Sequence, residues 1–265
     1  MSGWDSAETA ACYEAFCRSN SRYIEANSAL IAHAALEPHM QLLDLGAGTG
    51  RTAGAALPQL GNEGRVLCIE PHAGMRNMGI RRIIDPRVRW SAQLPDTSQS
   101  FDRILCGAAI WQVDRLAETL QLLAGLLRPG GAICFNIPAL YLQEPEEPGG
   151  GSDPYLLSLP ELLLARSDHD PAFGAPVVQA SAPLSASLLG EWLVAAGLRP
   201  VMWDFRLRIT QDAYAEWLKI PVTSDRLFGD LSPGERAQRI ETALRFVDRR
   251  SWKWEPWRGW TAWKT

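Results

Sequence analysis

The residues best suited to chemistry form one glycine-rich turn, Asp44-Leu45-Gly46-Ala47-Gly48-Thr49-Gly50. Glycines lack a Cβ atom, so the backbone can bend sharply there and a ligand can lie against the main chain. A dinucleotide turn has the pattern G-x-G-x-x-G, but Arg51 stands where its third glycine would be. The Gly-Lys-Ser/Thr sequence of a phosphate-binding loop is also absent. The turn therefore predicts a nucleotide-type ligand, although its spacing fits neither phosphate motif.

A second acid, Glu70, lies twenty residues after Gly50 and follows the apolar run of residues 66–69. A carboxylate at the end of such a strand can accept hydrogen bonds from both hydroxyls of an adenosine ribose, as nicotinamide and adenosylmethionine sites both require. The alternative is an acid solvated in a loop. Its place beside the glycine turn favours the ribose role for Glu70.

The elements that must position these residues follow from the hydrophobic pattern. Short apolar runs at 40–45, 66–69, 88–90, 101–106 and 132–137 read as strands, and they alternate with four helical segments. A single helix is expected over 5–36, and later helices are expected to begin at Asp114, Ser185, Thr210 and Ser232. This alternation predicts an α/β fold with a doubly wound, mostly parallel, seven-stranded Rossmann-like sheet.

The same pattern divides one domain of 1–265 into four parts. Residues 1–38 are expected to form a helical lid, 39–138 the cofactor-binding core, and 185–265 the completion of the sheet. Residues 139–184 interrupt the rhythm with proline, glycine and acids. Because long loops inside compact domains are usually functional, they are expected to form a cap insertion after the fifth strand, with a surface loop as the alternative.

The composition limits the partners. A net charge of −4 argues against a nucleic-acid partner, which would favour a basic surface. No stretch approaches the roughly 18 apolar residues of a membrane span, and the start of the chain does not resemble a signal peptide. The five cysteines show no CxxC spacing, which favours free thiols, a reducing cytoplasmic location and no metal site. Five of the eleven tryptophans fall in the last fourteen residues, so this tail should be packed.

Three strings carry a resemblance to a known family. They are residues 42–50, the pair Leu94-Pro95 followed by Ser100-Phe101-Asp102, and Leu127-Arg128-Pro129-Gly130-Gly131. Their order and spacing resemble those of class I S-adenosylmethionine-dependent methyltransferases. The likeness is greatest to the ubiquinone/menaquinone, biotin-pathway and trans-aconitate enzymes, and the ending of residues 257–264 is similar to their last strand. The resemblance implies S-adenosylmethionine as cofactor and a small molecule as methyl acceptor.

Carried over position by position, the resemblance implies a cofactor site in three groups. The methionine part and the ribose would contact Asp44, Gly46, Ala47, Gly48 and Glu70. The adenine would lie against Pro71, Met75, Ser91, Ala92 and Gln93. The floor near the sulfonium would consist of Cys106, Gly107 and Ala108. Relatives often carry an aspartate within residues 90–93, and this chain has none there.

Three further residues concern the lid and the acceptor. Tyr13 occupies the place of an aromatic lid residue, where it either faces the cationic sulfonium or belongs to the core. His169, flanked by two acids within the cap, is the candidate catalytic base, with an exposed loop histidine as the alternative. Trp111-Gln112 replaces the histidine-containing pair of many relatives, and Trp111 is expected to shape an apolar acceptor pocket.

Two other classes of function stay open at this point. One is a nicotinamide-dependent oxidoreductase, against which Arg51 and the lack of a Tyr-x-x-x-Lys pair argue. The other is a non-catalytic adenosylmethionine-binding subunit that regulates a partner. The sequence indicates neither the acceptor atom nor the oligomeric state.

Overall fold

A computed structural model describes residues 3–96, 99–142, 184–223, 231–246 and 249–265. The strands of its single sheet are β1 (Gln41–Leu45), β2 (Arg65–Ile69), β3 (Val88–Ser91), β4 (Phe101–Gly107), β5 (Leu127–Pro138), β6 (Leu198–Thr210) and β7 (Trp252–Lys264). The α-helices are α1 (Ala7–Ser19), α2 (Arg22–His33), α3 (Arg51–Ala56), α4 (Ala73–Arg82), α5 (Leu116–Leu126), α7 (Ala186–Ala195), α8 (Gln211–Leu218) and α10 (Pro233–Ala243).

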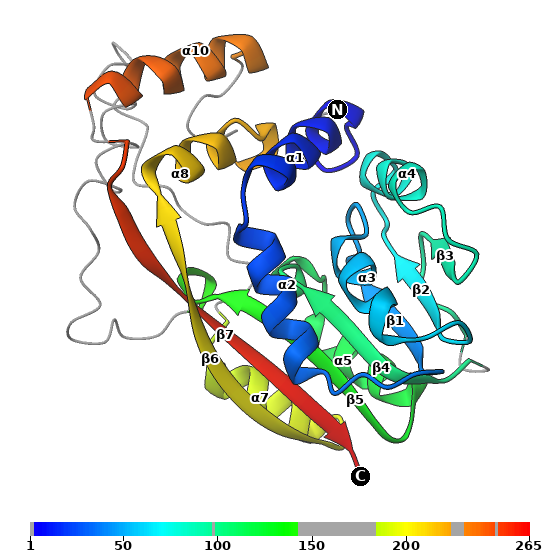
Figure 1. Cartoon of the computed structure of the whole chain (residues 1–265). Coiled ribbons are helices and arrows are strands. Elements are labelled where there is room, and N and C mark those ends of the chain that lie inside the picture. Colours follow the sequence, from blue (N-terminus) through cyan, green and yellow to red (C-terminus); the bar gives the residue numbers. More distant parts are fainter. Residues whose placement is uncertain (1–2, 97–98, 143–183, 224–230, 247–248) are drawn as a thin grey trace.

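The seven strands lie in the order β3-β2-β1-β4-β5-β7-β6 (Figure 1). The first five are parallel, and β7 runs antiparallel between β5 and β6. The predicted doubly wound, mostly parallel sheet is therefore confirmed. The chain steps outward from β1 through β2 to β3, then returns to the other side of β1 with β4. This reversal creates a switch point at the carboxyl ends of β1 and β4, where ligands bind in such sheets.

Helices cover both faces of the sheet (Figure 1). Leu43 of β1 faces α5 and α7 within one apolar cluster, while its neighbour Leu42 faces α2 and α3 within another. Successive side chains of a strand point to opposite faces, so a continuous apolar run such as β1 can be buried on both. The tryptophan-rich tail forms β7, in which Trp257 and Trp260 are almost fully buried.

The helix expected over 5–36 is instead two helices. Asn20 adopts an extended conformation between α1 and α2, and its side-chain Oδ1 accepts a hydrogen bond from the Arg22 N–H. Asparagine competes with helix in this way, so the chain turns at this residue and α1 leaves the direction of α2.

Three of the four expected helix starts are confirmed. Ser185, Thr210 and Ser232 each accept a hydrogen bond from the first turn of α7, α8 and α10. The start at Asp114 is wrong, because left-handed Arg115 precedes α5 and makes no side-chain cap. The pattern located the helix but not the turn before it.

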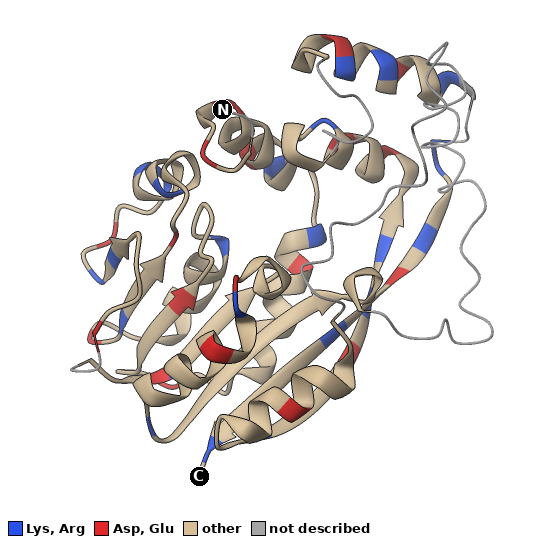
Figure 2. Cartoon of the chain, turned by 180° about the vertical axis from the view of Figure 1, so that it is seen from behind, with Lys and Arg blue, Asp and Glu red and all other residues tan. Residues whose placement is uncertain are grey.

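Most of the expected cap insertion lies outside the described residues, and so does His169. Within the described part, the five cysteines are free, no cluster of metal-binding side chains occurs, and no helix has the length and apolarity to cross a membrane. In Figure 2, the acidic and basic residues are interspersed along the ribbon of the described elements.

Candidate functional site

The glycine-rich turn joins the carboxyl end of β1 to α3. Gly46, Gly48 and Gly50 have φ angles of +64°, +57° and +79°. Residues with a side chain strongly disfavour such angles. A Cβ atom on Gly46 would lie 2.9 Å from that of Ala109, which is closer than packed atoms allow. The Ala47 N–H donates to the Ile69 carbonyl at 3.0 Å and ties the turn to β2. The glycines are therefore required by this bend, and they leave its main chain bare.

Asp44 lies beneath the turn with its side chain fully buried. Its Oδ2 accepts a hydrogen bond from the Ala53 N–H at 3.0 Å, while its Oδ1 has no partner within the described residues. Burial raises the pKa of this carboxyl from 3.8 to about 7. A buried oxygen without a donor is rare, and a cationic ammonium group would satisfy it. The residues present thus fit the amino-acid end of the cofactor.

Glu70 follows β2 and is 4% exposed. Its Oε2 accepts from the Gly48 N–H at 2.8 Å and its Oε1 from the His72 N–H at 2.9 Å. Burial is the main influence on its pKa, which lies above the ordinary value. Met75 packs beside the turn, since a Cβ built on Gly48 would lie 3.5 Å from the Met75 methyl. The structure thus brings together the turn, the acid predicted to bind the ribose and one residue predicted to contact the adenine.

Of the remaining residues predicted to contact adenine, Ser91 ends β3, Ala92 and Gln93 follow it, and Pro71 follows Glu70 after β2. The Ser91 carbonyl accepts from the Glu70 N–H at 2.9 Å, which places the end of β3 beside the ribose acid. The Ser91 hydroxyl donates to the Gln93 carbonyl at 2.7 Å, so it already has an acceptor. Ala92, Gln93 and Pro71 are exposed. Their roles toward adenine stay predictions.

The expected floor lies at the carboxyl end of β4, at the switch point: Cys106 and Gly107 end the strand and Ala108 follows it. Ala108 has a φ of +53°, and its N–H donates to Asn136 Oδ1 at 2.9 Å. The Asn136 side chain is fully buried and also donates to the Ala26 carbonyl at 2.8 Å. A Cβ on Gly107 would lie 2.4 Å from Thr52 Oγ1 and 2.6 Å from Asn27 Oδ1, so a larger residue here would displace these two side chains. The Cys106 side chain is buried in the core, which leaves main chain to line the floor.

Asn136 and Glu14 contact the candidate site, and the sequence analysis did not single them out. Asn136 is the one polar residue within the apolar run 132–137 of β5, and that signal was available. Glu14 lies on α1 with its carboxylate buried against Thr49 and Arg51 of the turn. Its partner cannot be read from spacing, because the angle between two helices decides it. The contact does place the N-terminal helix over the turn, as a lid would lie.

Tyr13 precedes Glu14 on α1 and is half-buried. Its ring contacts those of Trp4 and Tyr23, with centroids 5.9 and 5.5 Å away. Burial raises the pKa of its phenol well above the ordinary value. Tyr13 therefore packs in an aromatic cluster next to the turn, and both its predicted roles remain open.

Trp111 lies just after β4, in the short 3-10 helix Ile110–Gln112. Its ring stacks on that of Tyr141, with centroids 4.3 Å apart and planes 15° apart. Tyr141 follows β5, so the two rings form an aromatic wall beyond the carboxyl ends of β4 and β5. Its role toward an acceptor stays a prediction.

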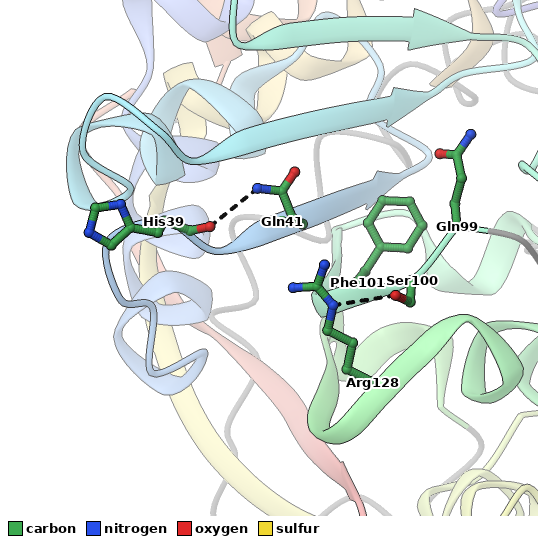
Figure 3. Close-up of a pocket in the computed structure, with 6 residues that line it drawn as sticks. All are labelled: His39, Gln41, Gln99, Ser100, Phe101 and Arg128. Carbon is green, nitrogen blue, oxygen red and sulfur yellow. Dashed lines mark hydrogen bonds between the residues drawn. The ribbon is translucent and has the colours of Figure 1, made fainter.

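A separate pocket of about 420 Å³ lies at the opposite edge of the sheet (Figure 3). Its lining residues are His39, Gln41, Gln99, Ser100, Phe101 and Arg128. They surround the amino-terminal ends of β1 and β4, away from the glycine turn. Ligands of open α/β sheets bind at the carboxyl ends, so this pocket is not assigned to the candidate site.

The fold and the turn define an α/β protein with a nucleotide-type site at its switch point. Residues 43–135 match a family model described as a methyltransferase domain. A curated relative is the ubiquinone/menaquinone biosynthesis C-methyltransferase UbiE of Coxiella burnetii, 32% identical over 121 residues, which are 42% of this chain and 48% of the relative. The chain thus matches about half the length of these relatives. The resemblance drawn from the sequence is confirmed for this part of the chain.

Solved structures show the same fold. The YcgJ protein from Bacillus subtilis has a TM-score of 0.58 at 19% identity, covering 91% of this chain and 98% of that one. Phosphoethanolamine N-methyltransferase 2 of Haemonchus contortus, in complex with phosphomonomethylethanolamine and S-adenosylhomocysteine, has a TM-score of 0.52 at 14% identity, covering 90% and 52%. At such identities the likeness concerns the fold alone.

Proposed function

We propose that this chain transfers a methyl group from S-adenosylmethionine to a small-molecule acceptor, in secondary or cofactor metabolism. The observation that carries the proposal is the pair of acids around the bare glycine turn. Asp44 offers a buried oxygen that has no donor among the residues that the structure describes, and Glu70 holds its carboxylate beside the Gly48 N–H. A cationic amino-acid group and a ribose would satisfy the two acids, whereas a pyrophosphate would face negative charge at both.

In this proposal the chain's own residues bind, orient and exclude water. Asp44 holds the ammonium group, Glu70 the ribose hydroxyls, and Met75 packs against the adenine. When bound, S-adenosylmethionine supplies a methyl group on a cationic sulfur that leaves as a neutral thioether, so no acid is needed. Catalysis then rests mainly on holding the acceptor in line with the sulfur, which is proximity and orientation work.

The acceptor is proposed to lie beyond Ala108, against the wall formed by Trp111 and Tyr141. Aromatic rings favour flat, apolar acceptors because they bury large areas and stack. An acidic hydroxyl or carbon would also need a base, worth roughly 10²–10⁴-fold in rate, and His169 stays the sequence's candidate. A cytoplasmic location likewise stays a proposal, supported by the free thiols.

Calorimetric titration with S-adenosylhomocysteine and, separately, with NAD(H) tests the cofactor. Binding of the former alone is expected, and binding of NAD(H) alone would overturn the proposal in favour of an oxidoreductase. Turnover needs a second experiment, in which the protein and labelled S-adenosylmethionine are incubated with a metabolite extract. Label should appear in a small molecule. Tight binding without any labelled product would instead indicate a regulatory subunit.

A further inference from the structure

The carboxylate of Glu14 joins the lid helix α1 to the glycine turn. Thr49 Oγ1 donates to its Oε1, and the Arg51 guanidinium donates to Oε1 at 3.2 Å and to Oε2 at 2.6 Å. Thr49 belongs to the turn and Arg51 is the first residue of α3. The Glu14 side chain is 7% exposed. One buried acid therefore holds two consecutive parts of the cofactor-binding backbone.

The same helix also reaches α4. Asp5, just before α1, accepts at Oδ1 from the Ala73 N–H at 3.0 Å, and a Cβ on Gly74 would lie 2.5 Å from the Asp5 carbonyl oxygen. Because α4 carries Met75, α1 spans the two elements that hold opposite ends of the proposed ligand. Figure 1 shows α1 lying next to α4 at the carboxyl end of the sheet.

The energetics make this contact conditional on the position of α1. A buried carboxylate is strongly unfavourable without cationic donors, and its pair with Arg51 is favourable only in the closed geometry. Arg82 adds a second cation, since its Nε lies 4.0 Å from Glu14 Oε1 and donates to the Thr49 carbonyl at 2.8 Å. When α1 lifts, Glu14 and Arg51 both return to water. The contact thus favours a fully closed or a fully open lid over intermediate positions.

We propose that Glu14 is a positioning residue that latches α1 over the bound cofactor and thereby sets how long the cofactor stays bound. This inference rests on the proposed function. It assigns the latch to the Glu14–Thr49–Arg51 contact rather than to the aromatic packing of Tyr13. The cofactor leaves when this contact opens, so its loss accelerates dissociation more than association.

Stopped-flow tryptophan fluorescence with S-adenosylhomocysteine tests the latch. Glu14→Ala should raise the dissociation rate about tenfold or more, because hydrogen bonds to a buried charge are lost. The association rate should change by less than about threefold, since an open lid does not obstruct entry. Glu8→Ala is the matched control, because Glu8 is an exposed acid on the same helix. It should leave both rates unchanged.

Two further variants separate latching from a general loss of structure. If Glu14 acts through Arg51, Glu14→Ala with Arg51→Ala should dissociate no faster than Glu14→Ala alone, a non-additivity expected of contacting partners. Glu14→Gln keeps an acceptor for Thr49 and should dissociate more slowly than Glu14→Ala. If Glu14→Ala fails to fold, as judged by circular dichroism, Thr49→Val tests the latch instead. This variant removes only the hydroxyl group that donates to Glu14.

The outcomes are distinguishable from failure of the proposed function. If the wild-type protein binds no S-adenosylhomocysteine, the proposed function fails. If the wild type binds and the folded Glu14→Ala variant releases the ligand at the wild-type rate, only the latch is overturned. An equal effect of Glu8→Ala would also overturn it, because the helix as a whole would then be responsible.

Discussion

The main-chain N–H of Gly48 donates to Glu70 Oε2 at 2.8 Å, so the glycine turn and the acid proposed to bind the ribose form one unit. The other carboxylate oxygen accepts from His72. The turn therefore depends on Glu70 for its shape, and the same carboxylate is proposed to bind the ligand. Sites whose backbone is fixed in advance lose less entropy when a ligand binds.

Glu70→Ala should weaken binding of S-adenosylhomocysteine about tenfold or more, because a buried charged hydrogen bond contributes ~1.5–3 kcal/mol. Calorimetric titration measures the change. Glu70→Gln is the matched variant, since it keeps the size of the side chain and one acceptor oxygen. It should lose less affinity than Glu70→Ala. Unchanged affinity in both variants would remove Glu70 from the site.

The raised pKa of Asp44 predicts how the stability of the protein depends on pH. Its pKa of about 7 in the folded protein lies above the ordinary 3.8, so the folded state keeps a proton that the unfolded chain releases. Stability from this group is therefore fully present below about pH 4 and falls up to about pH 7, by at most about 1.4 kcal/mol per pH unit. Asp44→Asn cannot ionise and should lack this fall. Urea unfolding of both proteins at pH 5 and pH 8 measures the difference.

The same carboxyl links binding to protons. A cationic ammonium beside Asp44 Oδ1 favours the ionised form, so ligand binding should release a proton below about pH 7. S-adenosylhomocysteine should thus bind more tightly as the pH rises from about 6 to 8. Calorimetry in two buffers of different ionisation enthalpy counts the protons. Proton uptake, or no exchange, would place the ammonium elsewhere.

Comparing Gly48→Ala with Gly130→Ala distinguishes the effect of backbone strain on stability from the loss of ligand binding. Gly48 and Gly130 both have positive φ angles, +57° and +73°, so alanine should cost each about 1–2 kcal/mol of stability. Gly130 lies in open space at the opposite edge of the sheet, with nothing within 4 Å of a built Cβ. Only Gly48→Ala should also weaken S-adenosylhomocysteine binding, because its methyl group would enter the turn. Equal loss of affinity in both variants would contradict the proposed position of the ligand.

The fold was predictable from the sequence because its signals are local. The apolar run of β1 and the glycines after it fix a strand followed by a bend, and Ser232 with Glu235 forms the expected capping box. Signals that consist of a single polar residue were less dependable. Ser185 and Thr210 cap α7 and α8 as expected, but Asp114 does not cap α5, and the break at Asn20 was missed.

The site was predictable only in part, for a related reason. Glu70 follows the motif at a fixed distance, so its place beside Gly48 could be expected. Glu14 meets Thr49 through the packing of α1, and Asn136 meets Ala108 through the pairing of β4 with β5. Such contacts depend on how whole elements lie against each other, which spacing along the chain does not record.

Trp111→Ala should raise the KM for the acceptor, once it is identified, about tenfold or more, while the affinity for S-adenosylhomocysteine stays the same. Removing the indole takes away the surface that stacks on Tyr141, and an aromatic pair contributes ~0.5–1.5 kcal/mol beyond the area that it buries. Leu122→Ala, on the exposed side of α5, serves as the control. Weakened cofactor binding in Trp111→Ala would instead place this residue on the cofactor side.

Arg22 and Glu255 predict the largest single effect on stability. The Arg22 guanidinium donates to Glu255 at 2.9 and 2.5 Å, and Trp257 Nε1 donates to the same carboxylate at 2.7 Å. The pair ties the first turn of α2 to β7, and its side chains are 8% and 10% exposed. Glu255→Leu leaves the arginine buried without its partner, which should cost about 3–5 kcal/mol.

Combining Glu255→Leu with Arg22→Met removes both charges and should restore most of that loss, because apolar replacements of a buried ion pair are often neutral. Urea unfolding curves of the two single variants and the double variant give the coupling. If the double variant loses as much as the sum of the single ones, the two residues act independently. The ion pair between Arg22 and Glu255 would then not be what holds α2 to β7.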